Sequence, residues 1–255
     1  MSKHSPVVWN VVEPISYDIN LPYRGLTAET GRTTNYPDYL PSFDPIFFDP
    51  LLVFDFVDPA LLVEDKSLPN LITSETKLTS IQPALGTIVE GVQLLDMSNS
   101  AKEELALLIS QRKAVVFPNQ DRFMNAGPTK QQEFMKFFGK PNYQPVSGSV
   151  KGHPGFHIIH RDGNKEEIAR FLSQKATTTL WHQDVSYEIQ PPGYVMLGLL
   201  QGPEVGGDTV FAATDLAYKR LSSAFQKLFD NLEAVHSSVK MISQVRERGK
   251  LKASL

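Results

Sequence analysis

The stretch that decides the fold reads WHQDVSY and occupies residues 181–187. We expect a strand from Thr177 to Val185, on which residues two apart point to the same face, roughly 6.6 Å from each other. His182 and Asp184 would then project together, while Gln183 points away. An imidazole nitrogen and a carboxylate oxygen can bind one cation in this arrangement, and such mixed ligands suit iron(II).

A His-x-Asp tripeptide is a weak signal by itself, because it also arises as an ordinary surface pair. Two further elements follow it here, PPG at residues 191–193 and GGDT at residues 206–209. We expect strands at Tyr194–Leu200 and Thr209–Ala212, and the two glycines permit a tight turn before the latter. This pattern closely resembles the taurine dioxygenase family, which has Trp-His-x-Asp, Pro-Pro and Gly-Gly-Asp-Thr at similar spacing.

The resemblance extends upstream, through KAVVFPNQ at residues 113–120 and FFGKP at residues 137–141, and covers about Ile81 to about Met241. The chain is identified as a member of this family, similar to its fungal sulfonate dioxygenases. The resemblance implies a double-stranded β-helix, or jelly roll, with flanking helices. This places the chain among α+β or mainly β proteins. It also implies Fe(II) as cofactor and 2-oxoglutarate as co-substrate.

Four residues take roles from the resemblance. His182 and Asp184 match the first two iron ligands. Thr209 matches the threonine whose hydroxyl binds the distal carboxylate of 2-oxoglutarate; without that context it would be a turn hydroxyl. Val185 follows the Asp ligand, where the family uses backbone near the anionic group of the substrate.

The substrate segment departs from the family pattern. Gln144 and Ser147 stand where taurine dioxygenase has a His and a Tyr. Gln144 can still donate a hydrogen bond to an anion, although it could be an ordinary loop residue. The implied reaction hydroxylates an organosulfonate next to sulfur and releases sulfite, with succinate and CO2 as co-products. Another small organic acid or an alkyl sulfate is the alternative substrate.

The third iron ligand and an arginine for the co-substrate lie far downstream in the family. Only 71 residues follow Asp184 here (255 − 184). The one histidine among them, His236, lies in a stretch that resembles an early family strand. We therefore expect a truncated chain with an incomplete jelly roll, which could be a catalytically inactive fragment.

The amino-acid composition excludes several classes of protein and of catalytic chemistry. The chain has 255 residues, 41% of them hydrophobic, and a net charge of −3, which argues against a surface built for nucleic acid or anionic membranes. It has no cysteine, which excludes disulfides, iron–sulfur clusters and thiol catalysis. Neither a secretory signal nor an apolar run of roughly 20 residues is evident. We expect a cytoplasmic protein that binds a small anionic molecule and can form a homo-oligomer.

Two regions are expected. Residues 1–80 form a proline-rich extension that packs over the core, makes a subunit contact or is a partly mobile leader. Residues 81–255 form the N-terminal part of a taurine dioxygenase-like domain. In it we expect helices at 101–112, 129–138, 216–221 and 224–232, and strands near 87–89 and 114–117. Asn99 or Ser100 should cap the first helix and Asp215 the third. A histidine cluster (His153, His157, His160) could form a second metal site, but no carboxylate lies at a convincing spacing, so we favour histidines that are exposed or satisfied by hydrogen bonds.

Overall fold

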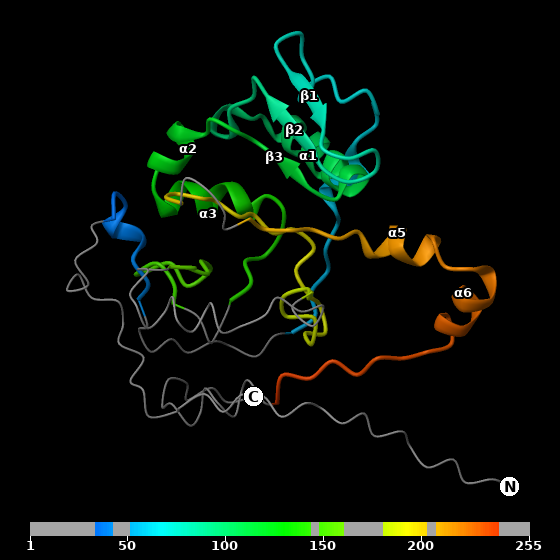
Figure 1. The fold of residues 1–255 in the computed structure, drawn as a ribbon. Coiled ribbons are helices and arrows are strands. Elements are labelled where there is room, and N and C mark those ends of the chain that lie inside the picture. The colour runs from blue at the N-terminus through cyan, green and yellow to red at the C-terminus, as the bar shows by residue number, and fades with distance from the viewer. Residues whose placement is uncertain (1–33, 43–51, 144–147, 161–180, 203–207, 240–255) are drawn as a thin grey trace, which may run out of the picture.

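The computed structural model describes residues 34–42, 52–143, 148–160, 181–202 and 208–239 (Figure 1). Its sheet has three strands in the order β1 (Lys77–Ser80), β2 (Thr87–Glu90) and β3 (Val115–Val116). β1 pairs antiparallel with β2, and β2 pairs parallel with β3. Thr87 and Val89 of β2 are buried while the residues between and after them are half-buried, as the two-residue period of a strand requires.

Helix α1 (Asn99–Arg112) connects β2 to the parallel strand β3. It buries Ala101, Glu104, Leu105 and Leu108, which have the spacing of one helical face, and it also buries Ala106. The predicted helix is confirmed, but the predicted cap is wrong. The Ser98 side chain accepts the hydrogen bond from the Ala101 N–H, and Asn99 and Ser100 already lie in the first turn.

Part of the proline-rich region belongs to the core. The short 3-10 helix η3 (Pro59–Leu62) packs against α1, and its first turn is capped by Asp58, which accepts from the Ala60 N–H. Leu68 and Leu71 are buried in the same cluster as Val89 of β2. The described residues from 58 to 71 therefore pack on the core, one of the alternatives expected from the sequence.

Helices α2 (Asp121–Asn125) and α3 (Pro128–Lys136) close the other side of the core with aromatic rings. The ring of Phe134 lies 5.3 Å from that of Phe123 and 5.6 Å from that of Phe138. The predicted helix at 129–138 is confirmed in position and ends at Lys136. Two further 3-10 turns, η2 (Pro37–Tyr39) and η4 (Leu94–Asp96), complete this part.

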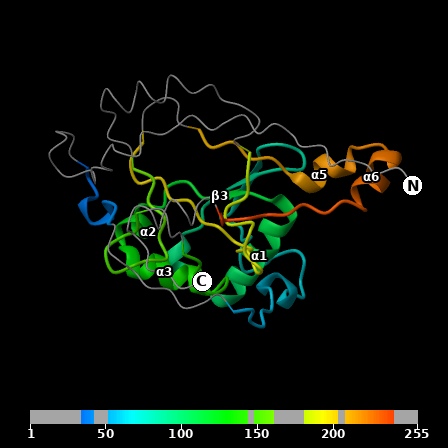
Figure 2. The same cartoon turned by 90° about the horizontal axis from the view of Figure 1, so that it is seen from below.

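Helices α5 (Thr214–Lys219) and α6 (Ser223–Phe229) lie apart from α1, α2 and α3 in both Figure 1 and Figure 2. Both were predicted, but Asp215 does not cap α5. It lies in the first turn, where its Oδ2 lies 3.3 Å from the Lys219 amine and 3.6 Å from the Lys113 amine. No helix in the described ranges is long and apolar enough to cross a membrane.

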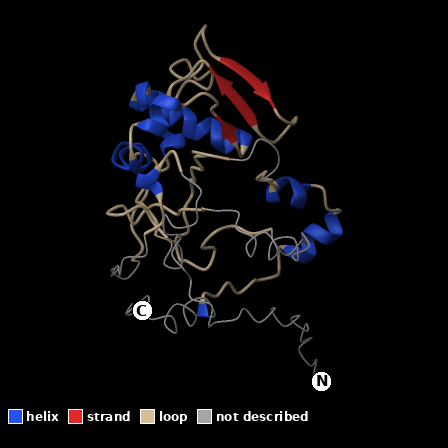
Figure 3. Cartoon of the chain, turned by 60° about the vertical axis from the view of Figure 1, so that its left-hand side comes forward, coloured by secondary structure: helices blue, strands red, loops and turns tan. Residues whose placement is uncertain are grey.

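The strands predicted at 194–200 and 209–212 are wrong for this structure, because both segments are irregular (Figure 3). A strand requires a partner for its backbone groups, and the ladders of the described residues are those of β1 to β3. Val195, Leu197 and Leu199 consequently stand 77%, 62% and 75% exposed. The structure thus shows a small mixed sheet with helices, and the complete jelly roll stays a prediction.

Candidate active site

His182 and Asp184 come together in the structure. The His182 Nε2 lies 3.2 Å from the Asp184 Oδ1, and the two side chains are 71% and 45% exposed. The predicted strand is wrong at this point, since residues 181–183 are irregular and a turn begins at Asp184. The turn, and not strand alternation, places both side chains on one side. The result is a nitrogen and an oxygen donor that converge in an accessible position.

Val185 gives this turn its shape. Its φ is +46°, a left-handed conformation that a β-branched residue rarely adopts. The side chain is nevertheless buried, at 6% exposure, and its carbonyl accepts a hydrogen bond of 3.0 Å from the Glu188 N–H. Strained backbone of this kind persists only where the surroundings hold it, and it concentrates at functional sites.

The carboxylate of Glu188 is held by a residue beyond α3. The Asn142 Nδ2 donates to the Glu188 Oε2 at 2.6 Å. Burial raises the pKa of Glu188 above its ordinary value, and the hydrogen bond from Asn142 partly opposes that shift. Burial also raises the pKa of Tyr187, with smaller contributions from Glu188 and Asp184. This side of the turn is therefore partly desolvated, while His182 and Asp184 face solvent.

Phe54, which precedes η3, forms hydrogen bonds with Gln190, just beyond the turn. The Gln190 side chain accepts from the Phe54 N–H at 3.1 Å and donates to the Phe54 carbonyl at 3.0 Å. The Lys140 amine lies 5.5 Å from the centre of the Phe54 ring. Residues 54, 140 and 190 thus meet, although they are far apart in the sequence. Nothing in the local sequence pattern indicated this contact.

His236 is a second contact that sequence reasoning missed. From the sequence, His236 was assigned only to a stretch that resembles an early family strand, but its Nδ1 lies 2.7 Å from the Oγ of Ser186, two residues beyond Asp184. Fifty residues separate the two, so no local signal could have found the pair.

The other predicted site residues are not joined to this turn. Thr209 lies on exposed, irregular backbone, and among the described residues it makes no hydrogen bond with His182 or Asp184. Gln144 and Ser147 lie outside the described residues. Within the described ranges no three His, Cys, Asp or Glu side chains gather as a metal cluster.

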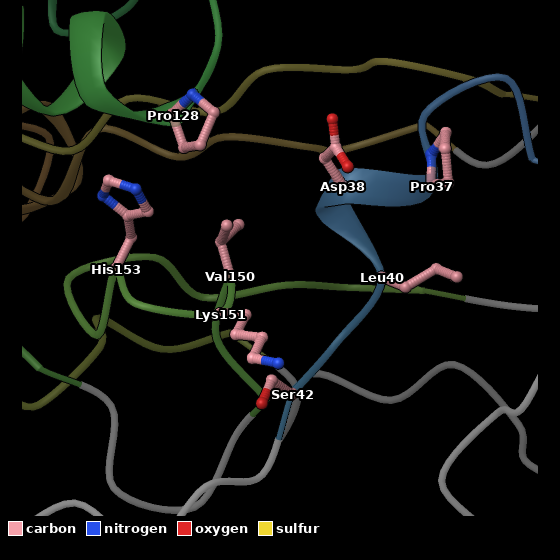
Figure 4. A pocket seen from close by; sticks show the side chains of 8 residues that line it. All are labelled: Pro37, Asp38, Leu40, Ser42, Pro128, Val150, Lys151 and His153. Carbon is pink, nitrogen blue, oxygen red and sulfur yellow. The ribbon is translucent and has the colours of Figure 1, made fainter.

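A separate cavity of about 470 Å³ lies between η2 and residues 150–153. Figure 4 shows His153 on one side of it and Asp38 on the other. The His153 Nδ1 lies 3.2 Å from the Oε1 of Gln132, so this member of the histidine cluster contacts α3. Neither His182 nor Asp184 lines the cavity.

Comparison with known proteins identifies a family model and several relatives that are similar to this chain. The family model described as "Taurine catabolism dioxygenase TauD, TfdA family" matches residues 77–253. An alpha-ketoglutarate-dependent sulfonate dioxygenase of Saccharomyces cerevisiae is 40% identical over 224 residues, covering 86% of this chain and 54% of the relative. The alpha-ketoglutarate-dependent dioxygenase cnsP of Penicillium expansum is 34% identical over 84% of this chain and 58% of its own length.

A more distant relative is named for a different substrate class. The alpha-ketoglutarate-dependent sulfate ester dioxygenase of Pseudomonas putida is 29% identical over 60% of this chain and 47% of its own length. The chain spans about half the length of these curated relatives. The match to the family model extends over most of the chain, including the His182–Asp184 turn. The chain belongs to the taurine catabolism dioxygenase TauD, TfdA family.

Proposed function

We propose that this chain provides the His-x-Asp half of an iron(II)- and 2-oxoglutarate-dependent dioxygenase that hydroxylates an organosulfonate next to sulfur. Sulfite, succinate and CO2 are the expected products. The observation that carries the proposal is the approach of the His182 Nε2 to the Asp184 Oδ1, 3.2 Å apart, in the segment that the family shares. The name of the yeast relative supports a sulfonate as substrate.

The two donors fit the metal. One imidazole and one carboxylate match two members of the two-histidine, one-carboxylate set typical of non-haem iron(II) oxygenases. Both side chains are exposed, so a metal ion can reach them. Bound iron(II) would supply the redox chemistry that couples decarboxylation of 2-oxoglutarate to hydroxylation of the substrate. Two protein ligands hold a metal less firmly than three, so we expect weak binding by this chain.

The remaining roles belong to side chains and backbone of the chain. The Thr209 hydroxyl would donate to the distal carboxylate of 2-oxoglutarate. The backbone at Val185 would lie near the anionic group of the substrate, with Gln144 and Ser147 as further substrate contacts. The buried Val185 side chain fixes the backbone beside Asp184, so that the donors and this backbone keep one geometry.

Further parts of the sequence interpretation stay predictions. These are the jelly roll, the division into an extension at 1–80 and a domain at 81–255, the cytoplasmic location and a homo-oligomer. The small mixed sheet and its helices are compatible with part of a jelly roll. That the chain binds no nucleic acid is a further prediction, and its net charge of −3 supports it.

The test is turnover by the purified chain. It is incubated with iron(II), ascorbate, 2-oxoglutarate and a panel of alkyl sulfonates and alkyl sulfates, and succinate and sulfite are measured. We expect both products with a sulfonate, none with Asp184→Ala, and unchanged amounts with Asp121→Ala, which removes a carboxylate on α2. Absence of succinate above background would show that this chain alone is inactive, the alternative expected from the sequence.

Sulfate esters are the second candidate substrates, because relatives of this chain are named as a sulfate ester dioxygenase and an alkylsulfatase. The same panel separates the classes. Hydroxylation next to the ester oxygen releases sulfate, whereas hydroxylation next to a sulfonate releases sulfite. Sulfate release with alkyl sulfates and none with sulfonates would favour the second class.

A further inference from the structure

The turn that follows Asp184 is strained and is held from outside itself. Val185 has a φ of +46° with its side chain buried, and the Glu188 N–H donates to its carbonyl at 3.0 Å. A β-branched residue in this conformation relaxes unless other contacts fix the backbone on both sides. The groups that fix residues 185–188 therefore also fix the direction of the Asp184 carboxylate.

Three contacts hold residues 186–190. Ser186 is bonded to His236, Glu188 to Asn142, and Gln190 to the backbone of Phe54. The first and third are exposed, whereas the second is half-buried. Water competes less for a partly buried hydrogen bond, and this one is short. The contact between Glu188 and Asn142 is therefore the strongest of the three.

Asn142 lies close in sequence to the aromatic core. It follows the end of α3 by few residues, and Phe138 between them is buried against Phe134 at a ring distance of 5.6 Å. Asn142 thus transmits the position of the core to Glu188. His236, by contrast, lies on an exposed, irregular stretch. The hydrogen bond from Asn142 thus connects the turn to the segment that follows α3 and its buried aromatic rings.

We propose that Asn142 and Glu188 form a positioning pair that fixes the turn at Val185 and so keeps His182 and Asp184 in a metal-binding arrangement. This inference rests on the proposed function of the two donors. The pair does not touch the metal, and it acts through the backbone between Asp184 and Glu188. Groups that orient metal ligands in this way commonly change metal affinity when they are removed.

The experiment uses the full chain with Trp9→Phe, which leaves Trp181, next to His182, as the one remaining tryptophan. Two quantities are measured: acrylamide quenching of Trp181 without metal, and the dissociation constant of Mn²⁺ by electron paramagnetic resonance. The variants are Asn142→Ala, Glu188→Ala, both together, and Glu188→Gln, whose amide oxygen still accepts from Asn142. Glu133→Ala is the control, because it removes a carboxylate that pairs with Lys130 on the surface of α3.

We expect Asn142→Ala and Glu188→Ala to increase quenching and to weaken Mn²⁺ binding by about tenfold. The double variant should be no weaker than either single one, because both remove the same contact. Glu188→Gln should stay within about twofold of the parent, since it retains the acceptor. A role limited to overall stability would not produce this rescue.

Unchanged quenching and unchanged Mn²⁺ affinity in Asn142→Ala and Glu188→Ala would overturn the inference. Equal effects of Glu188→Gln and Glu188→Ala would also overturn it, because charge and not the hydrogen bond would then matter. If the parent chain binds no Mn²⁺, the proposed metal site fails. Quenching of Trp181 then decides the positioning role by itself, so the two failures are distinguishable.

Discussion

The Tyr194 hydroxyl donates a hydrogen bond to the Asp58 Oδ1 at 2.6 Å, across 136 positions of sequence. The same oxygen accepts the Ala60 N–H and so caps η3. The Tyr194 ring lies 5.4 Å from that of Phe138. One carboxylate therefore joins the region before the sheet to the segment that follows the candidate metal donors, beside the aromatic core.

Replacing Tyr194 by Phe tests the hydrogen bond between Tyr194 and Asp58, which we call the tether. The ring contact with Phe138 remains, and the hydrogen bond to Asp58 is lost. We expect the free energy of unfolding to fall by about 1–2 kcal/mol, measured in urea. Tyr218→Phe is the control, since it removes an exposed hydrogen bond to Asp230 on the α5–α6 unit and should leave stability unchanged. Equal effects of both variants would argue against a special role of the tether.

The tether also predicts a dependence on pH. Burial, and then the hydrogen bond and charge of Asp58, raise the pKa of Tyr194 from its ordinary value of 10.0. The folded chain then holds this proton more tightly than the unfolded chain. Its contribution is fully present below pH 10.0 and is lost as the pH rises above that value. Unfolding in urea at increasing pH should show a steeper loss above this point for the parent than for Tyr194→Phe. Parallel curves would contradict the shift.

Replacing the buried Glu104 should lower the free energy of unfolding more than replacing Tyr194 does. It is 4% exposed on α1, and its carboxylate accepts from the Asn70 Nδ2 and from the Leu71 N–H, both at 2.6 Å. Glu104→Ala removes this acceptor from Asn70 and leaves the buried Leu71 N–H with the Leu68 carbonyl alone, at 3.1 Å, so we expect a loss of about 2 kcal/mol. Glu103→Ala removes the neighbouring carboxylate and should cost less than about 0.5 kcal/mol. Thermal or urea unfolding separates the two, and similar losses would refute the predicted role of Glu104.

Gly91 and Gly127 form a matched pair for a steric prediction. Both have a φ of +85°. A Cβ at Gly91 would lie 2.2 Å from the Glu75 carbonyl oxygen, whereas a Cβ at Gly127 would meet nothing within 4 Å. With a ψ of 166°, Gly127 lies in a region essentially confined to glycine, so Gly127→Ala should cost about 2 kcal/mol from backbone strain alone. Gly91→Ala must also displace backbone, so we expect a loss of more than about 3 kcal/mol. Equal melting temperatures for the two variants would contradict this geometry.

Parts of the fold could be predicted because their signals are local. The helical spacing of Leu105 and Leu108 predicted α1, and the phenylalanines beginning at Phe134 predicted α3. The strands predicted at 194–200 and 209–212 were wrong, because a strand depends on a partner that its own sequence does not contain. Their apolar side chains are consistent with a strand, but the pairing that would produce one is absent from the described residues.

The candidate site was likewise predicted in part from local sequence and decided in part by tertiary contacts. The sequence by itself determined the family, the identity of His182 and Asp184 as candidate donors, and the helices with a clear period. Only the tertiary structure decided that these donors converge through a turn at a strained Val185, and that Asn142, Phe54 and His236 hold that turn. The contacts of Asn142, Phe54 and His236 with the turn each join positions tens of residues apart or more, whereas periodicity and motifs report only neighbours along the chain.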